Sequence, residues 1–447
     1  MKKTEYSVFF LKIKILGACE TMKRKHKIKI FKRIYQLFIS NFLQYVLIFF
    51  ILIYLAAKFN SQEISFTDFL DIPLIISIFF AFAATKLSIL VSNFAKKKIE
   101  EESKLTINYD SIVSKYSKCN NMVSYINTSK KNERKGKKKT SSKYKMIDGK
   151  EIYIFPIIHE GILNGFDLEI SDKRDKYILP PQITDNYEKI MLAHNSSKVY
   201  NQQMIRLDKF KICREKKRIT MHTSRTDYYN SLVTNRAMDY SWIGNITSRE
   251  LYLPGPYVGT LEESVFSNHL GFNIFIETSD GKIIFTKRSK ILSIGKDLIG
   301  ASVSASVKVK YALDKKETFK KQGLEEAVKK EIYDELFIEK DRYCFSINRN
   351  LLTIYRDLIE GGKPHLFFYV KVELNSDVIE REFKRKHSQR KKSLSVDADK
   401  IIFIDRNCLK EMYITPDLIA TSSRSYHTLP YTAACLVMLI NYLENNN

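Results

Sequence analysis

A run of 21 uncharged residues, 37–57, constrains this chain more than any other feature. From Tyr45 onward the run is entirely apolar or aromatic. A helix of roughly 20 residues spans the ~30 Å hydrocarbon core of a bilayer, so the run predicts a transmembrane helix. Residues 72–94 form a second apolar run, where Lys86 lies near enough to one end to reach the headgroups. The two runs predict a transmembrane hairpin, and the alternative for each is a buried core helix.

Basic residues flank this hairpin unequally. Residues 1–36 carry eleven Lys and Arg, and Lys96, Lys97 and Lys98 follow the second run. The connector 58–71 carries one lysine against three acids. Because cytoplasmic flanks are enriched in Lys and Arg, the pattern predicts a multi-pass membrane protein with both termini in the cytoplasm.

The net charge of +24 predicts a polyanionic partner. Part of it lies in the polar linker 95–150, where Ser129–Lys145 holds nine basic residues and one acid. This stretch is either a strip that binds anionic lipid or a solvated spacer. A second basic run, Lys384–Lys392, has no aromatic residues interleaved, so direct nucleic-acid binding is not expected. The six cysteines show no paired spacing, which argues against a disulfide framework or a zinc site.

The remainder of the chain has a mixed pattern. Strand-like runs occur at 152–155, 272–277, 282–286, 302–309, 351–355, 366–372 and 400–405, and Asp280-Gly281 is a two-residue hairpin signal. Residues 324–336 have the period of an amphipathic helix, and a last helix is expected at 431–443. The order predicts an α+β sandwich, with an extension at 151–265 before a domain at 266–447.

One segment of the second helix, Lys330–Ile338, resembles the Nudix box. Glu331, Asp334 and Glu335 share one helix face, and such a carboxylate cluster could hold Mg²⁺ against a pyrophosphate. Phe337 stands where that family has glycine, and the upstream glutamate is replaced by Gln322. The resemblance therefore implies a Nudix-like α/β fold with a remnant metal site and no required cofactor; an ordinary helix with solvated acids is the alternative.

Segments upstream of this helix extend the resemblance. Thr226–Asn230, Thr234–Arg236 and Asn268–Gly271, together with the strand around Asp280–Ser289, look like NUDIX proteins associated with CD-NTase (SMODS) enzymes of CBASS antiphage systems. One group of these proteins combines two transmembrane helices with a C-terminal NUDIX-like domain. The resemblance implies an antiviral effector that senses a cyclic di- or oligonucleotide made by a partner CD-NTase. It also implies that the hairpins lie in the cell inner membrane, assemble as a homo-oligomer and disrupt that membrane.

A pocket for a cyclic nucleotide needs phosphate donors and aromatic rings. We expect Arg225, Arg236 and Arg288 to bind phosphates, Tyr228 and Phe368 to stack on bases, and Asn235 to contact a base edge. Thr226 is a further expected ligand residue. For each of these residues the alternative is a surface ion pair or a core aromatic. His365 is expected to be a hydrogen-bonded core histidine. The alternative function is a tethered, Mg²⁺-dependent Nudix hydrolase of a nucleoside diphosphate derivative.

Overall fold

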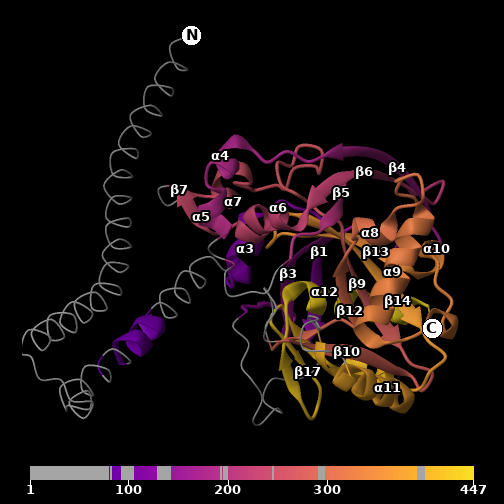
Figure 1. The fold of residues 1–447 in the computed structure, drawn as a ribbon. Coiled ribbons are helices and arrows are strands. Elements are labelled where there is room, and N and C mark those ends of the chain that lie inside the picture. The colour runs from indigo at the N-terminus through magenta and orange to yellow at the C-terminus, as the bar shows by residue number, and fades with distance from the viewer. Residues whose placement is uncertain are drawn as a thin grey trace, which may run out of the picture. The chain divides into compact units, whose positions relative to one another are not determined.

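The computed structural model describes residue 80 and residues 83–91, 105–127, 142–191, 194, 200–243, 246–289, 297–389 and 398–446 (Figure 1). The chain divides into two units, the first comprising Met1–Glu102 with Ser241–Ile246 and the second comprising Ser103–Tyr240 with Thr247–Asn447. Nearly all described residues belong to the second unit, which contains the predicted Nudix-like domain and, apart from Ser241–Ile246, the predicted extension.

The predicted membrane anchor is not supported by the structure. Among the described residues, no helix has both the length and the apolar character needed to cross a bilayer. Residues 37–57 lie outside the described residues; of 72–94, residues 80 and 83–91 are described and helical, with Lys86 among them. The lack of such a helix among the described residues contradicts the predicted transmembrane hairpin and the predicted multi-pass location in an inner membrane.

A ten-stranded mixed sheet forms the centre of the second unit. Its central pair is β9 (Gly271–Glu277) and β14 (Lys363–Lys371), which run parallel and are buried along almost their whole length. Parallel strands that are buried on both faces have nearly continuous apolar sequences, and the sequences of β9 and β14 are mostly apolar. The other strands of the sheet are β1 (Met122–Asn127), β2 (Lys145–Ile147), β3 (Lys150–His159), β10 (Lys282–Arg288), β11 (Ile299–Gly300), β12 (Val303–Ser306), β13 (Leu351–Asp357) and β15 (Ala398–Asp405).

The strands pair in the order β1-β3-β13-β14-β9-β10-β11, with β2 beside β3, β12 beside β9 and β15 beside β10. The pairs other than β9 and β14 are antiparallel. The turn between β9 and β10 contains Gly281 at a φ of +74°, as the hairpin signal predicts.

A long helix covers each face of this sheet. The apolar face of α9 (Lys321–Leu336) packs with Phe272 and Ile274 in one core, which confirms the helix predicted at 324–336. Helix α12 (Pro430–Asn445) packs with Phe275 and Phe367 in the other core and extends the helix predicted at 431–443. Because neighbouring residues of β9 point to opposite faces, the sheet needs both covers. The fold is therefore a mixed α/β sandwich, which corrects the α+β assignment.

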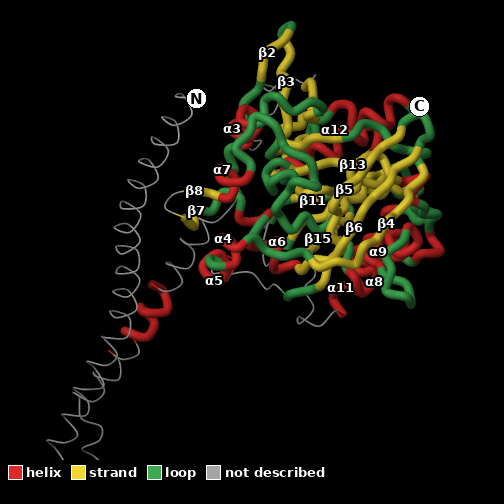
Figure 2. Tube along the Cα trace, turned by 90° about the horizontal axis from the view of Figure 1, so that it is seen from above, coloured by secondary structure: helices red, strands yellow, loops and turns green. Residues whose placement is uncertain are grey.

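A second sheet, of three strands, comes from the predicted extension (Figure 2). It consists of β4 (Asp167–Lys176), β6 (Arg218–Asp227) and β5 (Gln203–Cys213) in that order. Its inward residues Ile205, Leu207, Ile219 and Met221 belong to the same core as α9. The predicted extension and the predicted Nudix-like domain therefore share one hydrophobic core.

Short elements complete the described chain. The helical ones are α3 (Tyr109–Lys115), α4 (Pro181–Thr184), α5 (Tyr187–Met191), α6 (Tyr228–Val233), η4 (Asn235–Ala237), α7 (Ser248–Tyr252), α8 (Val309–Ala312), η5 (Lys340–Arg342), α10 (Ile347–Asn350), α11 (Ser376–Gln389) and η6 (Arg406–Glu411). The hairpin of β7 (Ser241–Ile243) and β8 (Ile246–Thr247) and the sheet of β16 (Tyr413–Thr415), β17 (Leu418–Ala420) and β18 (Ser425–His427) account for the remaining strands.

The end of α9 explains how the chain manages without the family glycine. Phe337 adopts a left-handed conformation with a φ of +60°, which is costly for a residue with a side chain. Its N–H donates to the carbonyl of Tyr333 at 2.8 Å. Its ring packs against Phe383 of α11, with ring centroids 5.9 Å apart. Burial of the aromatic ring thus offsets the strain that glycine would avoid.

Candidate functional site

Arg225, predicted to bind phosphate, forms a buried ion pair instead. Its Nη1 and Nη2 each lie 2.6 Å from one carboxylate oxygen of Asp172 in the neighbouring strand β4. Nη2 also donates to the carbonyl of Glu317 at 3.3 Å. With both fork nitrogens engaged, the guanidinium ties β6 to β4 rather than facing a ligand.

Two further predicted ligand residues also lie in the interior. Phe368 is fully buried, and its ring packs edge-on against Phe272 and Phe345 at 6.2 and 5.4 Å. Thr226 is buried, and its hydroxyl lies 2.8 Å from that of Ser267. These residues stabilise the core and are not placed to stack on or contact a ligand.

Asn235 and Arg236, in contrast, position a polar cluster. The Asn235 amide donates to Asn268 Oδ1 at 3.0 Å and to the Glu360 carbonyl at 2.9 Å. Arg236 Nε lies 3.2 Å from Glu360 Oε1, and Lys363 Nζ lies 3.1 Å from Glu360 Oε2. These contacts hold together η4, the segment before β9 and the β13–β14 turn. That turn contains Gly361 and Gly362, both at positive φ.

Two histidines lie at the buried end of this cluster. His269 lies two residues before β9, His365 is in β14, and the two residues are 0% and 8% exposed. Among the described residues, neither ring nitrogen of either histidine has a hydrogen-bond partner. His365 is therefore buried as expected, but the hydrogen bond expected of a core histidine is not found among the described residues. A buried polar group without a partner costs free energy, so two such rings call for a missing ligand or water.

The position of His365 is enforced by its neighbours. Its ring stacks between Tyr355 and Tyr431, with centroids 5.0 and 6.3 Å away and interplanar angles of 5° and 13°. Gly271 lies opposite His365 in the parallel register, and a Cβ there would come within 2.4 Å of Nδ1. Glycine is thus needed for the imidazole to lie against β9.

Electrostatics keep both imidazoles neutral in the absence of a ligand. Burial lowers the pKa of His269 well below its usual value, and the positive charges of Lys363 and Arg236 lower it further. Burial and the charge of Lys363 act in the same direction on the pKa of His365. Burial opposes ionisation of Glu360, but Arg236 and Lys363 outweigh it and lower the pKa. We call Arg236, His269, Glu360, Lys363, His365 and Tyr431 the imidazole cluster.

Partly exposed residues form the rim of the imidazole cluster. The Tyr228 ring lies 6.0 Å from the His269 ring. Burial raises the pKa of Tyr431, and the charges of Arg288 and Arg236 partly oppose this effect. Arg236 and Arg288, both predicted to bind phosphate, therefore act on the same tyrosine. The predicted ligand residues that the fold brings together are Tyr228, Asn235, Arg236 and Arg288.

The predicted metal residues do not form a metal site. Lys308 Nζ lies 2.6 Å from Glu331 Oε1, and Lys330 Nζ lies 2.5 Å from Asp334 Oδ1. The part of the chain that the structure describes contains no group of three or more His, Cys, Asp or Glu side chains able to hold a metal ion. Glu335, the third predicted ligand, is buried. Ammonium groups occupy the carboxylates that Mg²⁺ would need, so the residues present do not fit the ion.

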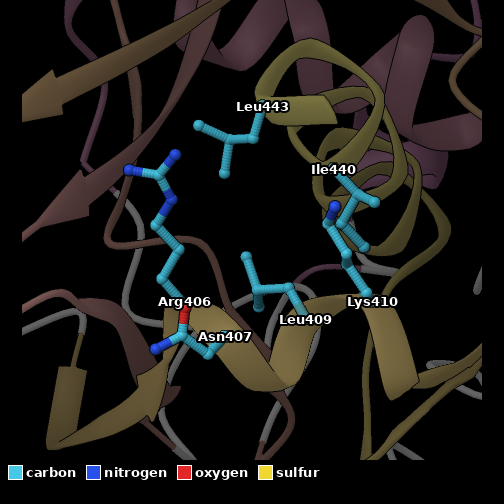
Figure 3. A pocket seen from close by; sticks show the side chains of 6 residues that line it. All are labelled: Arg406, Asn407, Leu409, Lys410, Ile440 and Leu443. Atoms are coloured by element: carbon cyan, nitrogen blue, oxygen red, sulfur yellow. The ribbon is translucent and has the colours of Figure 1, made fainter. Parts of the chain in front are cut away.

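Two cavities lie elsewhere on the surface. One, of about 320 Å³, lies between η6 and α12, and its side chains converge on the central space in Figure 3: Arg406, Asn407, Leu409, Lys410, Ile440 and Leu443. Its two cations already have acidic neighbours, since Arg406 lies 3.3 Å from Glu277 and Lys410 lies 3.9 Å from Glu444. The other, of about 590 Å³, lies on the outer face of the β4-β6-β5 sheet. Neither cavity includes a predicted ligand residue.

Comparisons with known proteins bear on the fold alone. No family model matches the sequence, and neither does any curated protein. The crystal structure of DR0079 from Deinococcus radiodurans is similar with 16% identity over 31% of this chain and 67% of its own, at a TM-score of 0.18. The MutT protein from Methanosarcina mazei is similar with 10% identity over 40% of this chain and 96% of its own, at a TM-score of 0.22. Both likenesses are weak, and the chemistry of the site rests on its own residues.

Proposed function

We propose that the imidazole cluster binds a phosphate group of a nucleotide, and that the nucleotide is a cyclic di- or oligonucleotide. The observation that carries the proposal is a pair of buried imidazoles, beside the cations Arg236 and Lys363, that have no hydrogen-bond partner among the described residues. A phosphate supplies acceptor oxygens and negative charge, which are what this surplus of donors and cations lacks.

The rim supports a ligand larger than inorganic phosphate. Tyr228 and Tyr431 are partly exposed aromatic rings next to the buried donors, and stacked bases favour such rings. Arg288, whose charge acts on Tyr431, provides a second cation. Buried cations beside partly exposed aromatic rings match a ligand that carries both phosphates and bases.

The resemblance to CD-NTase-associated NUDIX proteins supports the cyclic form of this ligand and a nucleotidyltransferase as the functional partner. We propose that ligand binding changes the assembly of the chain into a homo-oligomer. A ligand drives assembly only if it binds the assembled state more tightly, so light scattering with and without ligand tests this step directly. The hydrolase alternative is less well supported, because Lys308 and Lys330 hold carboxylates that a Mg²⁺ ion would need.

Calorimetry on the full chain tests the binding proposal. The panel is cyclic di-AMP, cyclic di-GMP, cyclic GMP–AMP and cyclic tri-AMP, with AMP and inorganic phosphate as simpler anions. We expect saturable binding of a cyclic nucleotide, weakened roughly tenfold or more by Arg236→Gln. The matched control is Arg218→Gln, which removes an exposed arginine of β6 that pairs with Glu169. Absence of binding across the panel, or equal weakening by the two variants, would contradict the proposal.

A further inference from the structure

We infer that His269 and His365 are themselves phosphate-binding residues, and that the arriving phosphate converts at least one of them to the doubly protonated imidazolium. This inference rests on the proposed nucleotide binding and adds its inner donors and its dependence on protons. Binding would therefore take up protons from solution, and the affinity would fall as the pH rises.

The geometry places the two imidazoles at neighbouring positions of the parallel pair. His365 lies opposite Gly271 in register, and His269 precedes Gly271 by two residues. The charge of His365 also acts on His269, as expected of rings that are close together. Each ring is more than nine-tenths buried, and its two nitrogens have no partner among the described residues. Four ring nitrogens without a hydrogen-bond partner among the described residues thus lie near the same two cations, Arg236 and Lys363.

Cations outnumber acids around the two rings. Arg236 and Lys363 act on both histidines, and Glu360 pairs with these same two cations. Burial and the charge of Glu360 raise the pKa of Asp357, which weakens its contribution of negative charge. The titratable and charged groups that face the pair are Tyr228 on α6, Arg236 on η4, Arg288 on β10, Tyr355 and Asp357 on β13, Glu360 in the turn, Lys363 on β14, and Tyr431 and Cys435 on α12.

The sign of the linkage follows from these charges. Without a ligand, burial and neighbouring cations disfavour the imidazolium, so both rings are neutral near pH 7. A neutral imidazole has one N–H donor and the imidazolium has two. A phosphate adds negative charge and acceptor oxygens, which favour the imidazolium and raise its pKa in the complex. If binding takes up one proton, the dissociation constant rises by up to about tenfold for each unit by which the pH is raised. This dependence holds between the imidazole pKa in the free protein and its pKa in the complex.

Calorimetry in buffers of different ionisation enthalpy at one pH measures this uptake. The titrant is whichever cyclic nucleotide of the panel binds the full chain, with inorganic phosphate as a second probe. In the unaltered protein we expect a net uptake of about half a proton to two protons for each ligand bound. The upper value corresponds to protonation of both imidazoles. His269→Asn and His365→Gln are each expected to reduce both uptake and affinity. The control His222→Gln changes a half-buried histidine of β6 outside the cluster and should leave both unchanged.

The outcomes separate this inference from the proposed function. Cyclic-nucleotide binding with no net proton uptake and a flat pH dependence would overturn the inference and leave nucleotide binding intact. Failure of every panel member to bind would overturn both. Uptake that persists unchanged in both histidine variants would assign the proton to another group and overturn the inference. Because the first measurement uses the unaltered protein, it remains decisive if a histidine variant fails to fold.

Discussion

Nζ of Lys308 lies 2.6 Å from Oε1 of Glu331, on the helix whose sequence resembles the Nudix box. The Glu331 side chain is 5% exposed and the Lys308 side chain is 24% exposed. The lysine comes from the residue that precedes α8, so a protein ammonium group supplies the positive charge that a metal ion would otherwise supply. The carboxylate of α9 is thereby satisfied within the chain.

Removal of this ammonium group should destabilise the protein. Lys308→Met leaves Glu331 buried beside an apolar side chain, so we expect a loss of about 2 kcal/mol, between the values for exposed and fully buried pairs. The double variant Lys308→Met/Glu331→Gln should recover most of the loss, because no charge remains buried. Urea unfolding measures each free energy. The control is Lys310→Met on α8, an exposed lysine beside the ring of Tyr311. Equal losses in Lys308→Met and Lys310→Met would show that the ion pair does not contribute to stability.

Gly271→Ala should displace His365. The added Cβ would lie 2.4 Å from Nδ1 and 2.6 Å from Cε1 of the imidazole, which is closer than atoms can approach. We expect a loss of about 1–3 kcal/mol, typical of overpacking, together with weaker nucleotide binding. Gly259→Ala is the control, because its Cβ meets only the flexible carboxylate of Glu263, at 3.1 Å. Retention of full ligand affinity in a folded Gly271→Ala protein would argue against a role for His365 in the site.

Arg225→Gln should weaken the fold and leave nucleotide affinity unchanged, since Arg225 faces Asp172. The side chains are 11% and 1% exposed, so removal of one partner should cost about 3 kcal/mol. Arg218→Gln, on the same strand but half exposed, should cost less than about 1 kcal/mol. Loss of ligand binding by folded Arg225→Gln would restore Arg225 as a ligand residue.

The same pair predicts the response to acid. Burial opposes ionisation of Asp172, but hydrogen bonds from Arg225, the Phe319 N–H and Thr223 lower its pKa below the usual value. A lowered folded-state pKa stabilises the protein above the unfolded value near pH 4, and the stabilisation is lost as the pH falls. Arg225→Gln removes part of this effect, so its acid unfolding midpoint should lie at higher pH. Circular dichroism during acid titration measures the midpoint, and an unchanged midpoint would contradict the assignment.

Local patterns predicted the elements better than they predicted the site. The period of Leu324–Leu336 and the apolar run of β9 required only neighbouring residues, and both gave the correct element. The partner of Arg225 lies 53 residues away in the sequence, on a parallel neighbouring strand, and no local pattern indicates it. The apolar runs 37–57 and 72–94 were interpreted by hydropathy alone, which measures length and polarity but not the packing of a segment.

The imidazole cluster shows the same limit. Its members come from η4, the start of β9, the β13–β14 turn and the start of α12, and only the fold brings them together. Gly361-Gly362 was a usable signal, because both residues adopt positive φ and the resulting turn brings Glu360 next to Lys363. His269 lies in the segment that resembles the NUDIX proteins, but its lack of a hydrogen-bond partner is visible only in three dimensions.

Nucleotide binding should be independent of divalent cations. Magnesium would have to displace the ammonium group of Lys308 from Glu331 and that of Lys330 from Asp334, and it prefers to keep its water ligands unless carboxylates are available. The donors of the imidazole cluster are cations and imidazoles, which bind phosphate without a bridging metal. We therefore expect the same dissociation constant in excess Mg²⁺ and in EDTA, and no conversion of the bound nucleotide. Calorimetry gives the constants, and chromatography of the recovered ligand detects turnover. If EDTA weakened binding, added Mg²⁺ restored it, and Glu331→Gln abolished the restoration, α9 would be a working metal site and the Nudix hydrolase would become the better interpretation.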